Sequence, residues 1–102
     1  MSDLNTKAAT KAAKPKMHLL PWTAVRAVAH VMTFGALKYE PNSWREAPFH
    51  RDMYLDAMLR HVVQLSTGEV RDAESGMLHA SHIATNALFL LWYELRDAGT
   101  EC

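Results

Sequence analysis

Residues 83–95 read IATNALFLLWYEL, and this stretch decides the fold. Only Thr85, Asn86 and Glu94 interrupt its apolar side chains, and there is no polar–apolar alternation to favour a strand. A helix that is apolar nearly all round is buried on several sides. Because a chain of 102 residues has a modest interior, we expect part of the cover to come from another subunit.

This C-terminal helix has recognisable ends. Ser75 is expected to cap it, and it is expected to run to about Arg96, before Gly99. The preceding helix is expected to start near Asp52 and to stop at Thr67-Gly68. Its apolar positions recur at helical intervals from residue 54 to residue 65.

A third helix is expected near the N-terminus. Pro21 suits a first helical turn, and apolar residues follow at helical spacing from Trp22 to Leu37. Gly35 either ends this helix or allows a close approach of another backbone or a ligand. The sequence therefore predicts an all-α fold, a small helical bundle of three main helices completed by oligomerisation.

The rest of the chain connects or flanks these helices. Residues 1–14 have little to bury and are expected to form a flexible basic tail, with a single helical domain over 15–98. Residues 16–20 lie between two prolines and are expected to be extended. A loop of about ten residues is expected over 40–49.

Composition narrows the class of protein. Eleven acidic residues balance eleven basic ones, which disfavours a nucleic-acid-binding domain. No apolar run approaches the ~20 residues of a membrane span. The single cysteine, Cys102, excludes an intrachain disulfide and fits a reducing compartment. We therefore expect a cytoplasmic protein.

A polar stripe crosses the apolar C-terminal helix. At ~100° per residue, Ser75, His79, His82 and Asn86 fall on one helical face, and His61 from the preceding helix could reach it. Two interpretations remain open: a divalent metal site, or imidazoles that only hydrogen-bond nearby carboxylates and carbonyls. Histidine ligands favour Zn²⁺ or Mn²⁺ over Mg²⁺, which prefers oxygen.

A second polar patch lies upstream. Lys38 could contact a phosphate, Tyr39 or Trp44 could stack on a base, and Asn42 could read a base edge. In the alternative interpretation, both aromatic rings lie in a subunit interface and Lys38 is solvated.

Several short motifs are spread over residues 14–92: KPKMHLLP (14–21), FGALKY (34–39), Asn42, Trp44, YLDAMLRH (54–61), Gly68-Glu69, Asp72, Glu74-Ser75-Gly76, His79, His82 and NALF (86–89). Together they resemble a phage-borne family named for the N-terminal domain of a dATP/dGTP diphosphohydrolase. That family is similar to the MazG-type all-α nucleotide pyrophosphohydrolases, which use Mg²⁺.

The chain departs from the MazG pattern in its acidic motifs. It has no Glu-Glu-x-x-Glu, and the spacing Glu-x-x-Asp occurs only at residues 69–72 and 94–97, not at residues 79–82. When the helices of this chain are matched to those of the MazG-type enzymes, residues 56–61 occupy the position of the first motif. His79-x-x-His82 then occupies the position of the second motif. Imidazoles then replace carboxylates that suit Mg²⁺. Either the metal differs, or the site binds phosphate, or hydrolysis has been lost.

The resemblance implies a purine deoxynucleotide ligand and a homo-oligomer, a dimer or a tetramer. One hypothesis is a metal-dependent nucleoside triphosphate pyrophosphohydrolase, with the host cytoplasm as its location if a phage encodes it. The alternative is a phage protein that binds or sequesters a nucleotide or nucleotide signal without turnover. The expected catalytic groups are Glu69 and Asp72. The expected nucleotide-binding residues are Lys38, Tyr39, Asn42, Trp44, Arg60 and Asn86, and the expected ligands of a divalent metal are His61, His79, His82 and Asp56. The family implies Mg²⁺ or Mn²⁺, whereas the ligand chemistry favours Zn²⁺ or Mn²⁺.

Overall fold

The computed structural model describes residues 14–38, 43–45 and 50–99. In this part of the chain three α-helices account for most of the structure, and the only extended pairing is a single antiparallel bridge between Arg71 and Leu78. The all-α prediction with three main helices is confirmed, while oligomerisation stays a prediction. The elements are η1 (Met17–Leu19), α2 (Trp22–Lys38), η2 (Ser43–Arg45), α3 (Arg51–Ser66) and α4 (His79–Asp97).

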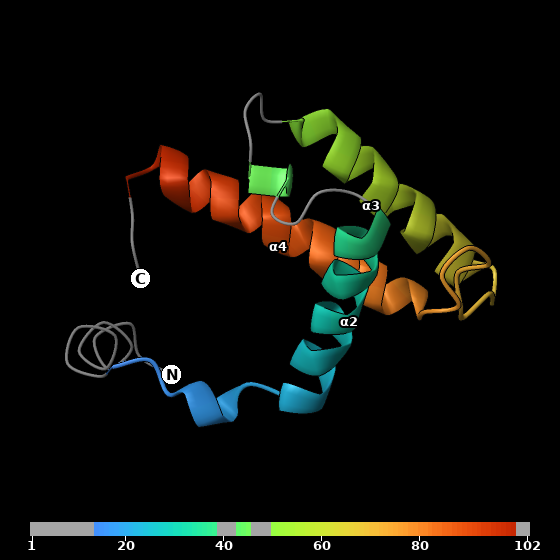
Figure 1. The fold of residues 1–102 in the computed structure, drawn as a ribbon, viewed down its shortest axis with the longest axis horizontal. Helices are drawn as coiled ribbons and strands as arrows, with labels where there is room; N and C mark the ends of the chain where they lie inside the picture. The colour runs from blue at the N-terminus through green and yellow to red at the C-terminus, as the bar shows by residue number, and fades with distance from the viewer. Residues whose placement is uncertain (1–13, 39–42, 46–49, 100–102) are drawn as a thin grey trace, which may run out of the picture.

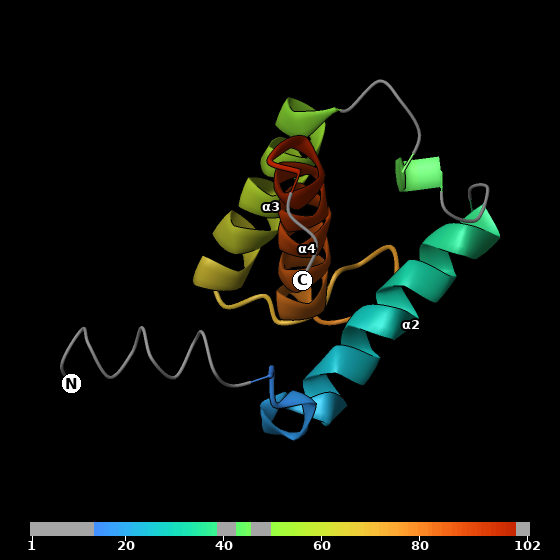
Figure 2. The same cartoon turned by 90° about the vertical axis from the view of Figure 1, so that its left-hand side faces the viewer.

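Helix α4 is the centre of the arrangement. α3 and α4 lie antiparallel and side by side, joined by the loop at residues 67–78 (Figure 1). α2 packs mainly against α4 and is inclined to the α3–α4 pair (Figure 2). None of the described helices is long and apolar enough to cross a membrane.

The N-terminal helix begins where proline chemistry predicts. The carbonyl of Pro21 accepts hydrogen bonds from the backbone N–H groups of residues 24 and 25. The extended prediction for residues 16–20 is wrong at its centre, because Met17–Leu19 form one 3-10 turn. Leu20, just before the proline, is extended as expected, with ψ of 137°.

Gly35 neither ends α2 nor marks a close approach. The helix continues to Lys38. Apart from its chain neighbours and the backbone of its own helix, no described heavy atom lies within 4 Å of a Cβ placed on Gly35. Both alternatives for Gly35 are therefore wrong, because it lies in an ordinary turn within α2.

The ends of α3 and α4 are predicted well, with one exception. Asp52 lies in the first turn of α3, and Gly68 follows its end with φ of 98°. α4 ends at Asp97, one residue beyond the expected end. The expectation that Ser75 caps α4 is wrong: the helix begins at His79, and its cap position, Leu78, offers no side-chain hydrogen bond.

The interior of the described chain is small and partly polar. Val31 and Tyr93 are its only buried apolar side chains. The hydroxyls of Tyr54 and Tyr93 both donate hydrogen bonds to the Trp44 carbonyl. These bonds connect η2 to α3 and α4. At the other end of α4 the buried side chains are polar: His79, Ser81 and Thr85.

Candidate functional site

Three histidines meet where the C-terminal half of α3 faces the start of α4. The Nδ1 atoms of His61 and His79 are 2.8 Å apart. The rings of His61 and His82 are stacked, with centroids 4.5 Å apart and an interplanar angle of 3°. The side chain of His79 is 0% exposed. We call these three residues the histidine cluster, and His61 makes the cross-helix approach that helical phasing predicts.

The loop between α3 and α4 brings a carboxylate and a hydroxyl to the cluster. Asp72 Oδ2 accepts a hydrogen bond of 2.8 Å from the Ser75 backbone N–H. Ser75 Oγ lies 2.7 Å from His82 Nε2 and accepts a bond of 3.2 Å from the Met77 N–H. Asp72 Oδ2 is 3.9 Å from His82 Nε2. Ser75 therefore fixes the loop and orients His82, instead of capping α4.

A tight turn holds this loop in place. The backbone N–H of Asp72 donates to the Met77 carbonyl, and the N–H of Gly76 donates to the Asp72 carbonyl, both at 2.8 Å. Gly76 has φ of 73°, a left-handed conformation that suits glycine. The turn makes Asp72 a rigid member of the site.

One buried nitrogen in the cluster has no hydrogen bond. Among the described buried side-chain N and O atoms, only Nε2 of His79 lacks a hydrogen-bond partner. A Glu69 carboxylate oxygen lies 3.4 Å away, within ion-pair distance, but not in hydrogen-bonding geometry. An unpaired buried polar atom costs about 1–3 kcal/mol, so this nitrogen suggests a ligand.

Burial favours the neutral imidazoles of His61 and His82. It lowers the pKa of His61, and the neighbouring charge of His82 acts in the same direction. Burial also lowers the pKa of His82, although the nearby Asp72 opposes the change. For Asp72, burial acts to raise the pKa, but the Ser75 hydrogen bonds and the two imidazoles outweigh it and lower the pKa. Neutral imidazoles beside an ionised carboxylate are the protonation states that bind metals.

The donor set suits a transition metal. His61, Asp72 and His79 each offer a ligand atom, and these atoms all lie within 4.8 Å of one another. Two nitrogens and one carboxylate oxygen fit Mn²⁺, Fe²⁺, Co²⁺ or Zn²⁺, whereas Mg²⁺ prefers an all-oxygen set. The residues present therefore do not fit the Mg²⁺ that the resemblance implies.

The other predicted site residues have partners of their own. Lys38 pairs with Glu74 of the loop, which places α2 close to the site. Arg60 pairs with Asp56 four residues before it, on the exposed surface of α3. The structure therefore does not bring Asp56 into the metal-capable group.

Asn86 and Trp44 are also occupied. The Asn86 amide donates to the His82 carbonyl, 2.9 Å away, along the same helix. The Trp44 ring stacks on Phe89 at 4.7 Å and meets Trp92 edge-on at 5.1 Å. In the described structure this ring is therefore a packing element. Tyr39 and Asn42 lie outside the described residues.

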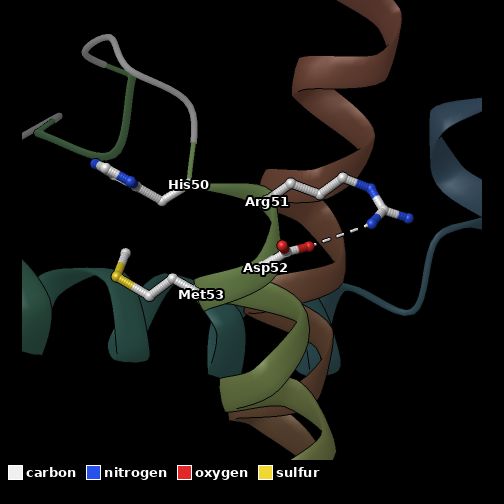
Figure 3. A pocket seen from close by; sticks show the side chains of 4 residues that line it. All are labelled: His50, Arg51, Asp52 and Met53. Carbon is white, nitrogen blue, oxygen red and sulfur yellow. Dashed lines mark ion pairs between the residues drawn. The ribbon is translucent and has the colours of Figure 1, made fainter.

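One surface hollow lies away from the cluster. It has a volume of about 420 Å³ and is lined by residues 50–53 at the start of α3 (Figure 3). Arg51 and Asp52 form an ion pair there. His61 is at least eight residues further along the helix, about 12 Å at 1.5 Å per residue.

Fold and site together define a class: an all-helical domain with a part-buried cluster of histidines and a carboxylate that lie close enough together to hold a metal ion. The chain belongs to the family described as dATP/dGTP diphosphohydrolase, N-terminal, whose model matches residues 4–101. It is 37% identical over 65 residues to a dATP/dGTP diphosphohydrolase of Salmonella phage PMBT28. That match covers 64% of this chain and only 22% of the relative. No solved structure matches the chain.

Proposed function

We propose that this domain hydrolyses purine deoxynucleoside triphosphates to the monophosphate and pyrophosphate, with a divalent transition metal at the histidine cluster. The observation that carries the proposal is the group of His61, Asp72 and His79, whose possible ligand atoms all lie within 4.8 Å of one another. The family and the name of the phage relative supply the substrate class.

His61, Asp72 and His79 would hold the metal. When bound, the ion would supply charge stabilisation for the triphosphate and a lowered pKa for water. His82 borders this group, and its hydrogen bond with Ser75 sets its ring orientation. In this role Ser75 and His82 are positioning residues for Asp72 and His61.

Glu69 is the proposed general base. Its side chain is 45% exposed and lies beside the cluster, so it can reach a water molecule at the rim. Asp72 is held by backbone hydrogen bonds and is better suited to be a ligand. The base takes a proton from the attacking water, whose oxygen bonds to the α-phosphorus. The bond from that phosphorus to the bridging oxygen then breaks, and pyrophosphate leaves.

The triphosphate charge would be met by Lys38. Its ammonium group already reaches the loop that carries Asp72 and pairs there with Glu74. An incoming phosphate would compete with Glu74 for this cation. Arg60, one residue before His61, is the second candidate, and a phosphate would compete with Asp56 for it.

Product analysis with dATP and dGTP tests this function. The protein is incubated with Mn²⁺, Co²⁺, Zn²⁺ or Mg²⁺, and nucleotides and pyrophosphate are separated by chromatography. We expect monophosphate and pyrophosphate in equal amounts with at least one transition metal. Loss of a general base lowers the rate by about 10²–10⁴-fold, so we expect that loss in Glu69→Gln and not in Asp52→Asn, an exposed control on α3.

A second candidate is nucleotide binding without turnover. It is favoured by one observation: the metal-capable group contains a single carboxylate, Asp72. Calorimetry with dATP and dGTP, followed by denaturation and chromatography, separates the two functions. Intact nucleotide recovered from a tight complex with every metal would exclude the hydrolase and support the binding protein.

A further inference from the structure

The two ring nitrogens of His79 face different groups. Its Nδ1 atom lies 2.8 Å from Nδ1 of His61, whereas its Nε2 atom lies 3.4 Å from a carboxylate oxygen of Glu69. The two nitrogens of an imidazole point to different sides of the ring, so one ion cannot take both. An ion shared by His61 and His79 therefore lies on the Nδ1 side, and Nε2 is left to a partner from the protein.

The backbone of the loop before α4 places Glu69 beside His79. The backbone N–H of His79 donates to the Val70 carbonyl at 2.9 Å, directly beside the antiparallel bridge. The backbone N–H of Glu69 donates to the Gln64 carbonyl at 3.2 Å, which attaches the start of the loop to the end of α3. These backbone contacts hold the two residues close together and do not depend on either side chain.

The Glu69 carboxylate is available to Nε2 of His79. Among the described residues, Glu69 forms its only ion pair with His79. The present angle is not that of a hydrogen bond, and Nε2 is buried without another partner. Because the Glu69 side chain is 45% exposed, its carboxylate can rotate into line with an N–H on Nε2. Such a charge-assisted bond is stronger than a bond between neutral groups.

We propose that Glu69 is a positioning residue for His79: it accepts a hydrogen bond from Nε2–H and thereby selects the tautomer whose Nδ1 lone pair is free for a metal. A neutral imidazole carries a single N–H. With that N–H on Nδ1, the ring would point a lone pair at the Glu69 carboxylate and close the Nδ1 side to a cation. Metal-binding histidines commonly donate their second ring N–H to a carboxylate in this way. The inference rests on the metal site of the proposed function. One oxygen of Glu69 serves His79, and the other remains for the attacking water.

Equilibrium dialysis with Zn²⁺ or Mn²⁺ measures the effect of this hydrogen bond on metal affinity. Glu69→Ala removes the acceptor, and we expect it to lower the affinity by about 10–100-fold. Glu69→Gln keeps an acceptor oxygen, so we expect a loss of less than about 10-fold, because a neutral acceptor makes a weaker bond. Asp52→Ala removes an exposed carboxylate from α3 and is the charge-matched control, which should bind like the wild type. Equal affinity in Glu69→Ala and the wild type, or equal losses in Glu69→Ala and Glu69→Gln, would overturn the proposal.

Nitrogen-15 NMR of the metal-free wild type reads the tautomer of His79 directly and does not require any variant to fold. We expect the ring proton on Nε2, and we expect Glu69→Ala to raise the fraction of molecules with the proton on Nδ1. A wild type with the proton on Nδ1, or with protons on both ring nitrogens, would overturn the proposal.

Hydrolysis is measured separately on the same proteins. If Glu69 has both roles, Glu69→Gln keeps most of the metal affinity and loses the hydrolysis of dGTP. A wild type that binds the metal and yields no product would remove the proposed hydrolase, whereas the positioning role of Glu69 would stand or fall on the dialysis and the NMR.

Discussion

At the scale of single residues, the buried imidazoles are the costly feature of this domain. His79 is fully enclosed, and one of its ring nitrogens has no hydrogen bond. The 2.8 Å separation of the His61 and His79 Nδ1 atoms permits one proton between them, because two N–H groups would repel each other. A cation would use the lone pairs of both Nδ1 atoms at once, as the proposed metal site requires.

The lowered pKa values of His61 and His82 predict acid sensitivity in the metal-free protein. The unfolded chain binds protons at these residues near pH 6.5, whereas the folded chain binds them only at lower pH. The contribution of these two histidines to folding stability is therefore complete above pH 6.5. It is lost as the pH falls through their pKa values in the folded chain. Asp72 adds a further loss below pH 3.8, its ordinary pKa.

Thermal unfolding in EDTA between pH 5 and pH 8 measures this effect. We expect the melting temperature to fall below pH 6.5, and the fall to be smaller in the double variant His61→Gln/His82→Gln. His30→Gln, on the exposed surface of α2, is the control and should behave like the wild type. A melting temperature that rises on acidification would refute the linkage.

Helical phasing from the sequence predicts part of the site. The spacing of His79 and His82, together with His61 on the preceding helix, was enough to place three imidazoles together. The role of Ser75 was missed, because its hydrogen bonds depend on a turn with a left-handed glycine. The signal was present: Asp72 and Ser75, followed by glycine, are residues that favour such a turn.

At the scale of elements, two glycines allow the effect of backbone conformation on stability to be compared. Gly68 ends α3 with φ of 98°, whereas Gly35 lies inside α2 with no neighbour near its Cβ position. We expect Gly68→Ala to destabilise the fold by about 1–2 kcal/mol, and Gly35→Ala to stabilise it by up to about 1 kcal/mol. Urea unfolding of both variants checks the signs, and equal effects would show that backbone conformation does not decide them.

Helix boundaries were predictable where local chemistry sets them. Pro21 and Gly68 act on their own backbone, and the structure follows them within a residue or two. The start of α4 was not predictable in this way, since the loop before it is held by bonds between Asp72 and Met77 and between Val70 and His79. These contacts form only when the loop folds back on itself, as the isolated bridge shows.

At the scale of the whole molecule, a three-helix arrangement with a small interior supports two separate surfaces of α4. One face carries the histidine cluster, and the opposite face carries exposed apolar side chains such as Leu88 and Leu91. The chain spans about a fifth of the length of the phage relative, so the activity of that longer protein is a proposal for this domain. The similarity to MazG-type enzymes stays a prediction, and so does metal binding by this domain.

Metal binding to the histidine cluster is tested most directly by equilibrium dialysis, followed by elemental analysis of the protein. We expect about one Mn²⁺ or Zn²⁺ ion per chain in the wild type and in His30→Ala. We expect a loss of at least 10-fold in affinity in His61→Ala, because His61 is a proposed ligand. An ion retained equally by His61→Ala, or no ion bound by the wild type, would contradict the proposed metal site.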